Sequence, residues 1–482
     1  MSNYLDLPIK EINKLLKDGS IKPIDIVNEA FAKIEKDSYE AFITLNKEEA
    51  IKTAKELEKL PVDNLLFGIP VAIKDNICTK DLLTTCASHM LDNFIPVYDA
   101  TVIKKLKDKH MIIIGKTNMD EFAMGSTGET SYFKITKNPW NMKKVPGGSS
   151  SGSAASVSSR EVACALGSDT GGSVRQPSSF CGLVGLKPTY GRVSRYGLIA
   201  FGSSLDQIGT MTKNVEDNAI MLNAIAGYDE NDQTSSKKDV PDFTSLIGKD
   251  IKDLKIAVPN YYMSDAIDAE VKNNIKDIIA KIKKAGCTVD YIDIPYLEYS
   301  IPLYQVVALG EASSNLARYD GIKYGHIAKD YTDIDSLYCN SRSEGFGREV
   351  KRRIMIGSYV LSGENANIYF RKALKVREAL TNEFKKVFTK YDLIIGPTNT
   401  NVAYDLGTKS DDALKSFYDD LLTIPVNMAG LPGMSLPVGF NSENMPIGMH
   451  IIGNYFREDQ IYQLGSFIES DLKLDLNPRG GK

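Results

Sequence analysis

Short apolar runs recur along the chain, and helix-like segments separate most of them. Residues 65–73 predict a buried strand that ends at Lys74, and residues 111–114 predict another after a helical segment that starts near residue 99. Further strand-like runs lie near residues 394, 436 and 451. Strands that alternate with helices are typical of α/β proteins, so the sequence predicts that fold class.

The N-terminal part and the middle of the chain carry simpler signals. Two amphipathic helices are expected at 9–16, before Gly19, and at 24–34, after Pro23. The polar segment 229–242 has the composition of a linker. Beyond it, a helix over 268–284 is flanked by two strand-like segments.

Composition excludes several classes of protein. Hydrophobic residues make up 43% of the 482 residues and charged residues 25%, which indicates a folded globular protein. A formal net charge of -4 disfavours a chain that grips phosphate backbones by itself, so any nucleic acid would need a partner. No apolar run approaches the roughly 18 residues that span a bilayer, and the N-terminus resembles a helix more than a signal peptide. The six cysteines form no C-x-x-C pair, which favours a reducing cytoplasm and predicts neither a zinc site nor a disulfide framework.

A serine-rich segment occupies residues 149–159, with seven serines among eleven residues. Composition alone would make it a flexible linker. Ala154, Ala155 and Val157 interrupt the serines, however, and a strand-like run starts at Val162. A helix of small residues packed tightly against the sheet fits this pattern better.

A second glycine-rich segment, GSDTGGS at 167–173, follows a predicted strand and precedes a probable helix. Backbone N–H groups of its last four residues would converge near the helix N-terminus, as in an oxyanion hole. These residues are Thr170, Gly171, Gly172 and Ser173. A plain tight turn or a phosphate-binding loop has the same local pattern, although no G-x-x-x-x-G-K-[ST] motif occurs.

A serine nucleophile needs a base within hydrogen-bond reach. None of the four histidines lies in a recognisable catalytic context. Lys74, at the end of a buried run, is the alternative base, because burial favours the neutral amine. By itself it also fits a lysine that extends from a strand end to solvent.

Three segments together resemble the amidase signature family: GIPVAIKDN at 68–76, PGGSSSGSAA at 146–155 and GSDTGGSVRQPSSFCG at 167–182. The spacings of 75 residues from Lys74 to Ser149 and of 24 residues from Ser149 to Ser173 agree with the family pattern. The resemblance implies Lys74 as general base, Ser149 as a relay serine after a cis peptide bond, and Ser173 as the nucleophile that forms the acyl-enzyme. Ser150 is the residue most easily confused with Ser149, and Ser151 stands where the family usually has glycine.

Longer blocks at 192–219, 316–325, 345–362 and 419–437 resemble one subgroup, the A subunits of glutamyl-tRNA(Gln) amidotransferases. The resemblance implies that Tyr304, Arg353 and Asp420 bind the amino-acid end of glutamine. Segments 363–370 and 397–407 depart from the subgroup's usual sequence.

The resemblance also implies the fold, a single amidase-signature domain over 1–482 with a large mixed central sheet covered by helices on both faces. Within it we expect N-terminal helices at 1–60 and a catalytic core at 61–228. A lobe over the site at about 230–395 and a C-terminal return to the core at 396–482 complete this expected division.

The implied function is that of a glutaminase subunit, which releases ammonia from glutamine for the ATP-dependent conversion of Glu-tRNA(Gln) to Gln-tRNA(Gln). In the implied heterotrimer this chain has two partners: an ATP-using B-type subunit, through which the tRNA binds, and a small C-type subunit. We expect no cofactor or metal in this chain, and ATP and Mg²⁺ to be used by the B-type partner. A free-standing amidase and a non-catalytic scaffold are the two alternatives.

Overall fold

The computed structural model describes residues 3–36, 38–408 and 418–478. Its strands form one 11-stranded sheet in the order β1-β3-β2-β4-β6-β5-β10-β11-β9-β7-β8. The strands are β1 (Phe42–Leu45), β2 (Pro70–Lys74), β3 (Ile112–Thr117), β4 (Cys164–Asp169), β5 (Val184–Lys187), β6 (Gln207–Thr212), β7 (Lys255–Pro259), β8 (Thr288–Ile292), β9 (Leu393–Pro397), β10 (Gly433–Phe440) and β11 (Pro446–Gly453).

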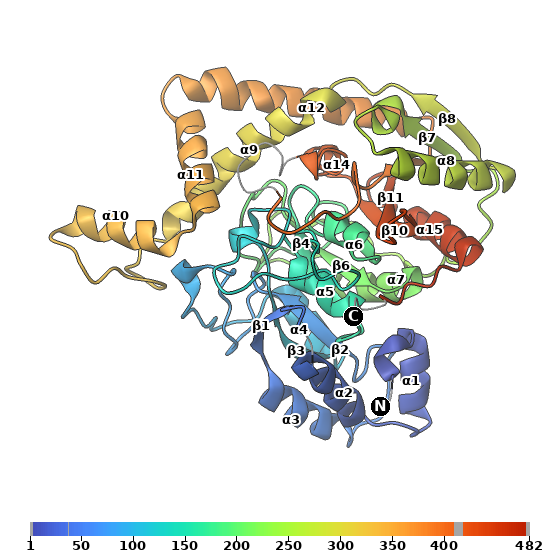
Figure 1. Ribbon diagram of the computed structural model, residues 1–482, viewed down its shortest axis with the longest axis horizontal. Helices are drawn as coiled ribbons and strands as arrows, with labels where there is room; N and C mark the ends of the chain where they lie inside the picture. The colour runs from blue at the N-terminus through green and yellow to red at the C-terminus, as the bar shows by residue number, and fades with distance from the viewer. Residues whose placement is uncertain (1–2, 37, 409–417, 479–482) are drawn as a thin grey trace.

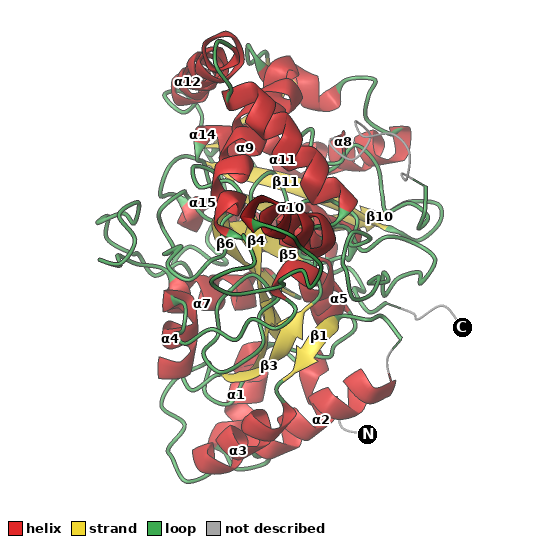
Figure 2. Ribbon diagram, turned by 90° about the vertical axis from the view of Figure 1, so that its left-hand side faces the viewer, coloured by secondary structure: helices red, strands yellow, loops and turns green. Residues whose placement is uncertain are grey.

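The sheet is mixed. Strands β3, β2 and β4 run parallel to one another, as do β9, β7 and β8, while the remaining neighbours are antiparallel. Helices lie on both faces: α4 and α7 are on one side of the strands and α5 is on the other (Figure 2). The predicted fold, an α/β protein with a large mixed central sheet covered on both faces, is therefore confirmed.

The helices begin and end close to the predicted signals. They are α1 (Ile9–Lys17), α2 (Pro23–Lys36), α3 (Lys47–Leu57), α4 (Thr101–Asp108), α5 (Ser151–Ser158), α6 (Arg175–Phe180), α7 (Val215–Ile225), α8 (Ala269–Lys284), α9 (Ser300–Asn315), α10 (Ile334–Gly345), α11 (Arg348–Leu361), α12 (Arg371–Val387), α14 (Ile424–Ala429) and α15 (Glu458–Leu472). Asp268 caps α8 by accepting hydrogen bonds from the N–H groups of Glu270 and Val271, and Gly19 follows α1 with a positive φ of 76°.

The serine-rich segment forms helix α5, and all eight of its residues are buried. Its small side chains let the helix approach its neighbours closely: a Cβ at Gly152 would clash with the carbonyl of Ala41 and the backbone of Asn118. Ser151, in place of the family's glycine, is accommodated as the first residue of the helix, and its hydroxyl donates to the Asn118 carbonyl at 3.4 Å. The interpretation as a buried helix is confirmed.

Residues between 230 and 395 contribute to two regions. Strands β7 and β8 extend one end of the sheet, whereas α9, α11 and α12 form a helical group that packs on α14. Helix α10 projects from this group at one side of the molecule, opposite α8 (Figure 1). The segment 229–242 contains no regular helix or strand, but Asp229 fixes it to the core by accepting hydrogen bonds from Thr101 and Ser194. The division of the chain into four segments stays a prediction.

Within the described ranges, none of the helices combines the length and the apolar character needed to cross a bilayer. All six cysteines have free thiols, and all but Cys339 are buried.

Candidate active site

Lys74 is the last residue of β2, and its side chain is completely buried. Its Nζ lies 2.6 Å from Ser149 Oγ and 3.2 Å from the carbonyl oxygen of Ser168. The parallel register of β2 and β4 brings these groups together, because it places the carboxyl ends of both strands at the same edge of the sheet. The lysine therefore points into the protein and does not extend to solvent.

Burial sets the charge state of this lysine. It lowers the pKa of Lys74 from 10.5 to about 7, although the carboxylates of Asp120 and Asp169 act in the opposite direction. A large fraction of the Lys74 side chain is therefore a neutral amine near pH 7, and a neutral amine can accept a proton.

Ser149 follows a cis peptide bond from Gly148. The N–H of Gly148 donates to Gln176 Oε1 at 2.9 Å, and the carbonyl of Ser149 accepts from the N–H of Asp120 at 3.2 Å. Ser150 differs in its partner, since its hydroxyl donates to the Ser168 carbonyl at 3.3 Å. The hydroxyl that contacts Lys74 therefore belongs to Ser149 and not to its neighbour.

Ser173 lies on the loop between β4 and α6, and it is buried. Its carbonyl accepts a hydrogen bond from the N–H of Ser150 at 3.2 Å, which holds the loop beside the serine-rich segment. Among the described residues, no hydrogen bond links Ser173 Oγ to Ser149 Oγ. Hydrogen bonds between catalytic groups often form only when substrate is bound. The assignment of Lys74, Ser149 and Ser173 as a triad stays a prediction.

The predicted oxyanion loop contains Thr170, Gly171, Gly172 and Ser173. Within the described part of the chain, the N–H groups of Gly171, Gly172 and Ser173 donate to no other residue. Backbone amides without an internal acceptor are available to a developing oxyanion. The positive φ of Gly172, 155°, is a conformation that side-chain-bearing residues rarely adopt.

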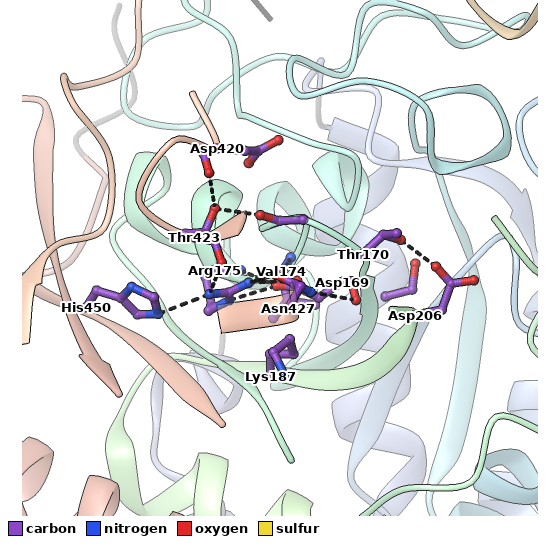
Figure 3. A network of polar contacts seen from close by, with 12 residues as sticks. Asp169, Thr170, Val174, Arg175, Lys187, Asp206, Asp420, Thr423, Asn427 and His450 are labelled. Atoms are coloured by element: carbon purple, nitrogen blue, oxygen red, sulfur yellow. Dashed lines mark hydrogen bonds and ion pairs between the residues drawn. The ribbon is translucent and has the colours of Figure 1, made fainter. Parts of the chain in front are cut away.

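A buried ion pair supports this loop from below (Figure 3). The guanidinium of Arg175 donates two hydrogen bonds to the carboxylate of Asp169, at 2.9 and 3.0 Å, and the N–H of Val174 donates to the same carboxylate at 3.1 Å. Burial opposes ionisation of Asp169, but Arg175 outweighs it and holds the pKa of that carboxyl well below its usual range. Arg175 also contacts His450 Nε2, at 3.1 Å, which gives this buried histidine a structural partner.

The three predicted glutamine-binding residues come from α9, α11 and the turn before α14. Tyr304 is buried, and its phenol ring lies against Gly171. The carboxylate of Asp420 lies beside Gly172, and its Oδ1 has no hydrogen-bond partner among the described residues. Arg353 is buried and donates to Glu349 at 2.6 Å. The structure therefore places Tyr304 and Asp420 directly against the oxyanion loop.

The electrostatics of Asp420 suit a cationic ligand. Burial, and then the neighbouring Asp419 carboxylate, raise the pKa of Asp420 well above its usual range. Arg175, and then Arg353, oppose this shift only in part. An ammonium group placed beside Asp420 would favour its ionised form, because an opposite charge lowers the pKa of a carboxyl.

Sequence reasoning missed several residues of the site. Phe201 contacts two of the residues predicted to bind glutamine. Its ring centroid is 6.5 Å from that of Tyr304 and 5.7 Å from the Arg353 guanidinium. Asp206 accepts a hydrogen bond from the Thr170 hydroxyl at 2.7 Å, and Thr423 donates to the Gly171 carbonyl at 2.7 Å. None of these residues carries a local signal, although the block 192–219 that resembles one subgroup contains two of them.

Comparison with known proteins identifies the family of this chain. The family model described as Amidase matches residues 25–462, and the chain belongs to the amidase family. It is 52% identical over 471 residues to the glutamyl-tRNA(Gln) amidotransferase A subunit of Pediococcus pentosaceus, with 97% of each chain covered. The corresponding protein of Staphylococcus epidermidis is also 52% identical, over 472 residues and 97% of each chain.

Solved structures give the same result. The crystal structure of the glutamyl-tRNA(Gln) amidotransferase A subunit from Thermotoga maritima is 41% identical, with a TM-score of 0.83, and the alignment covers 99% of this chain and 97% of that one. The structure of 6-aminohexanoate cyclic dimer hydrolase is 23% identical with a TM-score of 0.86, covers 98% of both chains and shows the shared fold alone.

We expect amide hydrolysis to increase with pH and to level off above about pH 7, because only the neutral form of Lys74 accepts a proton. The measurement is kcat/KM as a function of pH. Lys187 is a matched control: burial lowers its pKa to about 7 as well, but its Nζ donates to the Pro188 carbonyl at 2.8 Å. Lys187→Met should keep the pH dependence of kcat/KM. Loss of this pH dependence in Lys187→Met would contradict the role of Lys74.

Proposed function

We propose that this chain is the glutaminase subunit of a glutamyl-tRNA(Gln) amidotransferase. The observation that carries the proposal is the 52% identity to A subunits over 97% of both chains. The site geometry is consistent with it, because the buried contact between Lys74 and Ser149 lies beside a loop with available amides. Glutamine is the proposed substrate, and glutamate and ammonia are the products.

The proposed mechanism is a proton relay. Neutral Lys74 takes the proton of Ser149 Oγ, which in turn takes the proton of Ser173 Oγ as that oxygen attacks the side-chain carbonyl carbon of glutamine. The amides of residues 170–173 hold the resulting oxyanion. When the C–N bond breaks, the relay returns a proton to the nitrogen and ammonia leaves. Water then attacks the acyl-enzyme and releases glutamate.

Recognition of the amino-acid end follows from charge. Arg353 is the proposed partner of the α-carboxylate, since a guanidinium binds a carboxylate through two parallel hydrogen bonds. Asp420 is the proposed partner of the α-ammonium group, and the lack of a hydrogen-bond partner for its Oδ1 among the described residues agrees with that role. Tyr304 would pack over the substrate beside Gly171.

The remaining steps of amidation belong, in this proposal, to partner proteins. An ATP-using B-type subunit would activate the glutamate on Glu-tRNA(Gln) with ATP and Mg²⁺, and a small C-type subunit would complete the heterotrimer. A chain with net charge -4 and no P-loop motif is poorly suited to bind tRNA or ATP alone.

The nucleophile is tested by Ser173→Ala in the assembled complex. Glutamate release should be abolished, whereas amidation with added ammonium salt should continue, because Ser173 is needed only to release ammonia. Ser178→Ala, which removes a buried hydroxyl from α6, is the matched control and should keep both activities. Parallel loss of ammonia-dependent amidation in Ser173→Ala would indicate a structural role for Ser173.

The carboxylate contact is tested by Arg353→Lys. We expect KM for glutamine to rise about tenfold to a hundredfold, the cost of a charged hydrogen bond, because lysine cannot reproduce a planar two-point contact. A glutamine analogue without the α-carboxylate should be affected much less.

Arg352→Lys provides the control for that variant, since Arg352 also donates to Glu349, at 2.7 and 2.9 Å, but is partly exposed. It should leave KM nearly unchanged. Equal losses on glutamine and on the analogue in Arg353→Lys would place Arg353 outside the binding site.

Dependence on partners separates this proposal from a free-standing amidase. We expect the purified chain to release little glutamate alone and more when misacylated tRNA and the ATP-using partner are present, because ammonia released without an activated acceptor is lost. The measurement is glutamate release with and without these components. Full activity of the isolated chain, unchanged by the partners, would favour the free-standing amidase.

A further inference from the structure

The peptide between Gly171 and Gly172 lies against the turn that carries Asp420. The Thr423 hydroxyl is directed at two backbone carbonyls, that of Gly171 at 2.7 Å and that of Asp420 at 3.1 Å. Figure 3 shows Thr423 bonded to the Asp420 backbone above the Arg175 network. Thr423 therefore joins the oxyanion loop to the Asp420 turn, although the two are about 250 residues apart in sequence.

A hydrogen bond to a peptide carbonyl also orients the N–H of the same peptide. In a trans peptide the C=O and N–H groups are coplanar and point in opposite directions. Because the Thr423 hydroxyl fixes the Gly171 carbonyl, it also fixes the direction of the Gly172 N–H. That N–H is one of the proposed oxyanion donors, and it donates to no other residue within the described chain.

The surrounding contacts restrict the loop further. A Cβ at Gly172 would clash with Thr423 Oγ1 and Asp420 Oδ1, so the loop and the turn are packed without spare room. Beneath them, Arg175 donates to the Thr423 carbonyl at 3.1 Å. At the other end of the loop, the Thr170 hydroxyl donates to Asp206 at 2.7 Å. The Gly171–Gly172 peptide is therefore held between two fixed points.

The turn itself has a fixed geometry. The N–H groups of Thr423 and Ile424 both donate to the Asp420 carbonyl, at 3.1 and 2.9 Å. The same turn therefore carries Asp420 and, through Thr423, contacts the Gly171 carbonyl.

We propose that Thr423 is a positioning residue that aligns the Gly172 N–H with the oxyanion. The inference rests on the proposed glutaminase function. Its specific consequence is that the Thr423 hydroxyl acts on the transition state and not on ground-state binding of glutamine. Removal of an interaction of this kind lowers kcat and leaves the Kd of the substrate unchanged.

The test compares Thr423→Val with Thr423→Ser in the assembled complex. Valine has nearly the same shape but no hydroxyl, so kcat for glutamate release should fall about tenfold or more, part of the 10²–10³-fold cost of deleting an oxyanion donor. Serine keeps the hydroxyl and should restore most of the rate. Kd for glutamine, measured by calorimetry in the Ser173→Ala background, should not change with Thr423→Val.

Thr210→Val is the matched control. Thr210, on β6, is also buried, and its hydroxyl donates to Asn218 at 2.7 Å. The substitution removes a comparable hydrogen bond and should leave kcat unchanged. If Thr423→Val does not fold, Thr423→Ala takes its place with the same expectation, because it also lacks the hydroxyl.

Three results would overturn the inference: an unchanged kcat in Thr423→Val, an equal loss in Thr423→Ser, or a rise in Kd that accounts for the loss of rate. The last would mean that Thr423 acts only by holding Asp420. If the unsubstituted complex released no glutamate, the proposed function would fail and this inference with it. If the unsubstituted complex released glutamate but Thr423→Val left kcat unchanged, this inference alone would fail and the proposed function would stand.

Discussion

The proposed proton relay depends on the burial of one amine. Lys74 is completely enclosed at the end of β2, and desolvation alone is large enough to bring its pKa down to about 7 despite nearby carboxylates. A more exposed lysine would remain protonated at neutral pH and could not act as a base. The proposed relay therefore requires the close packing around β2, β4 and the all-buried helix α5.

Sheet topology explains why groups far apart in sequence meet at this amine. The parallel pairing of β2 with β4 puts Lys74 and the start of the oxyanion loop at one edge. The antiparallel pairing of β4 with β6 sets Asp169 opposite Gln207, so Asp206 falls beside Thr170.

Much of this arrangement could be predicted from sequence where local patterns are strong. The buried run before Lys74, the small-residue helix after Ser149 and the strand–loop–helix around Ser173 each have a short-range signal, and the structure contains all three elements. Contacts made by single polar residues across long separations have no such signal. The bonds from Thr423 to Gly171 and from Thr170 to Asp206 are fixed by tertiary packing, which residue type and spacing do not encode.

The two halves of the site have different origins in the chain. The lysine and serines come from residues 74–173 on and beside the sheet, whereas Tyr304, Arg353 and Asp420 come from α9, α11 and the turn before α14. Solved structures only 22–25% identical to this chain have the same fold, with TM-scores of 0.82–0.86. Substitutions in the later segments can change what is bound while β2, β4 and α5 stay in place. The turn from Asp420 to Thr423 is the exception, because its contacts with Gly171 and Arg175 belong to both halves.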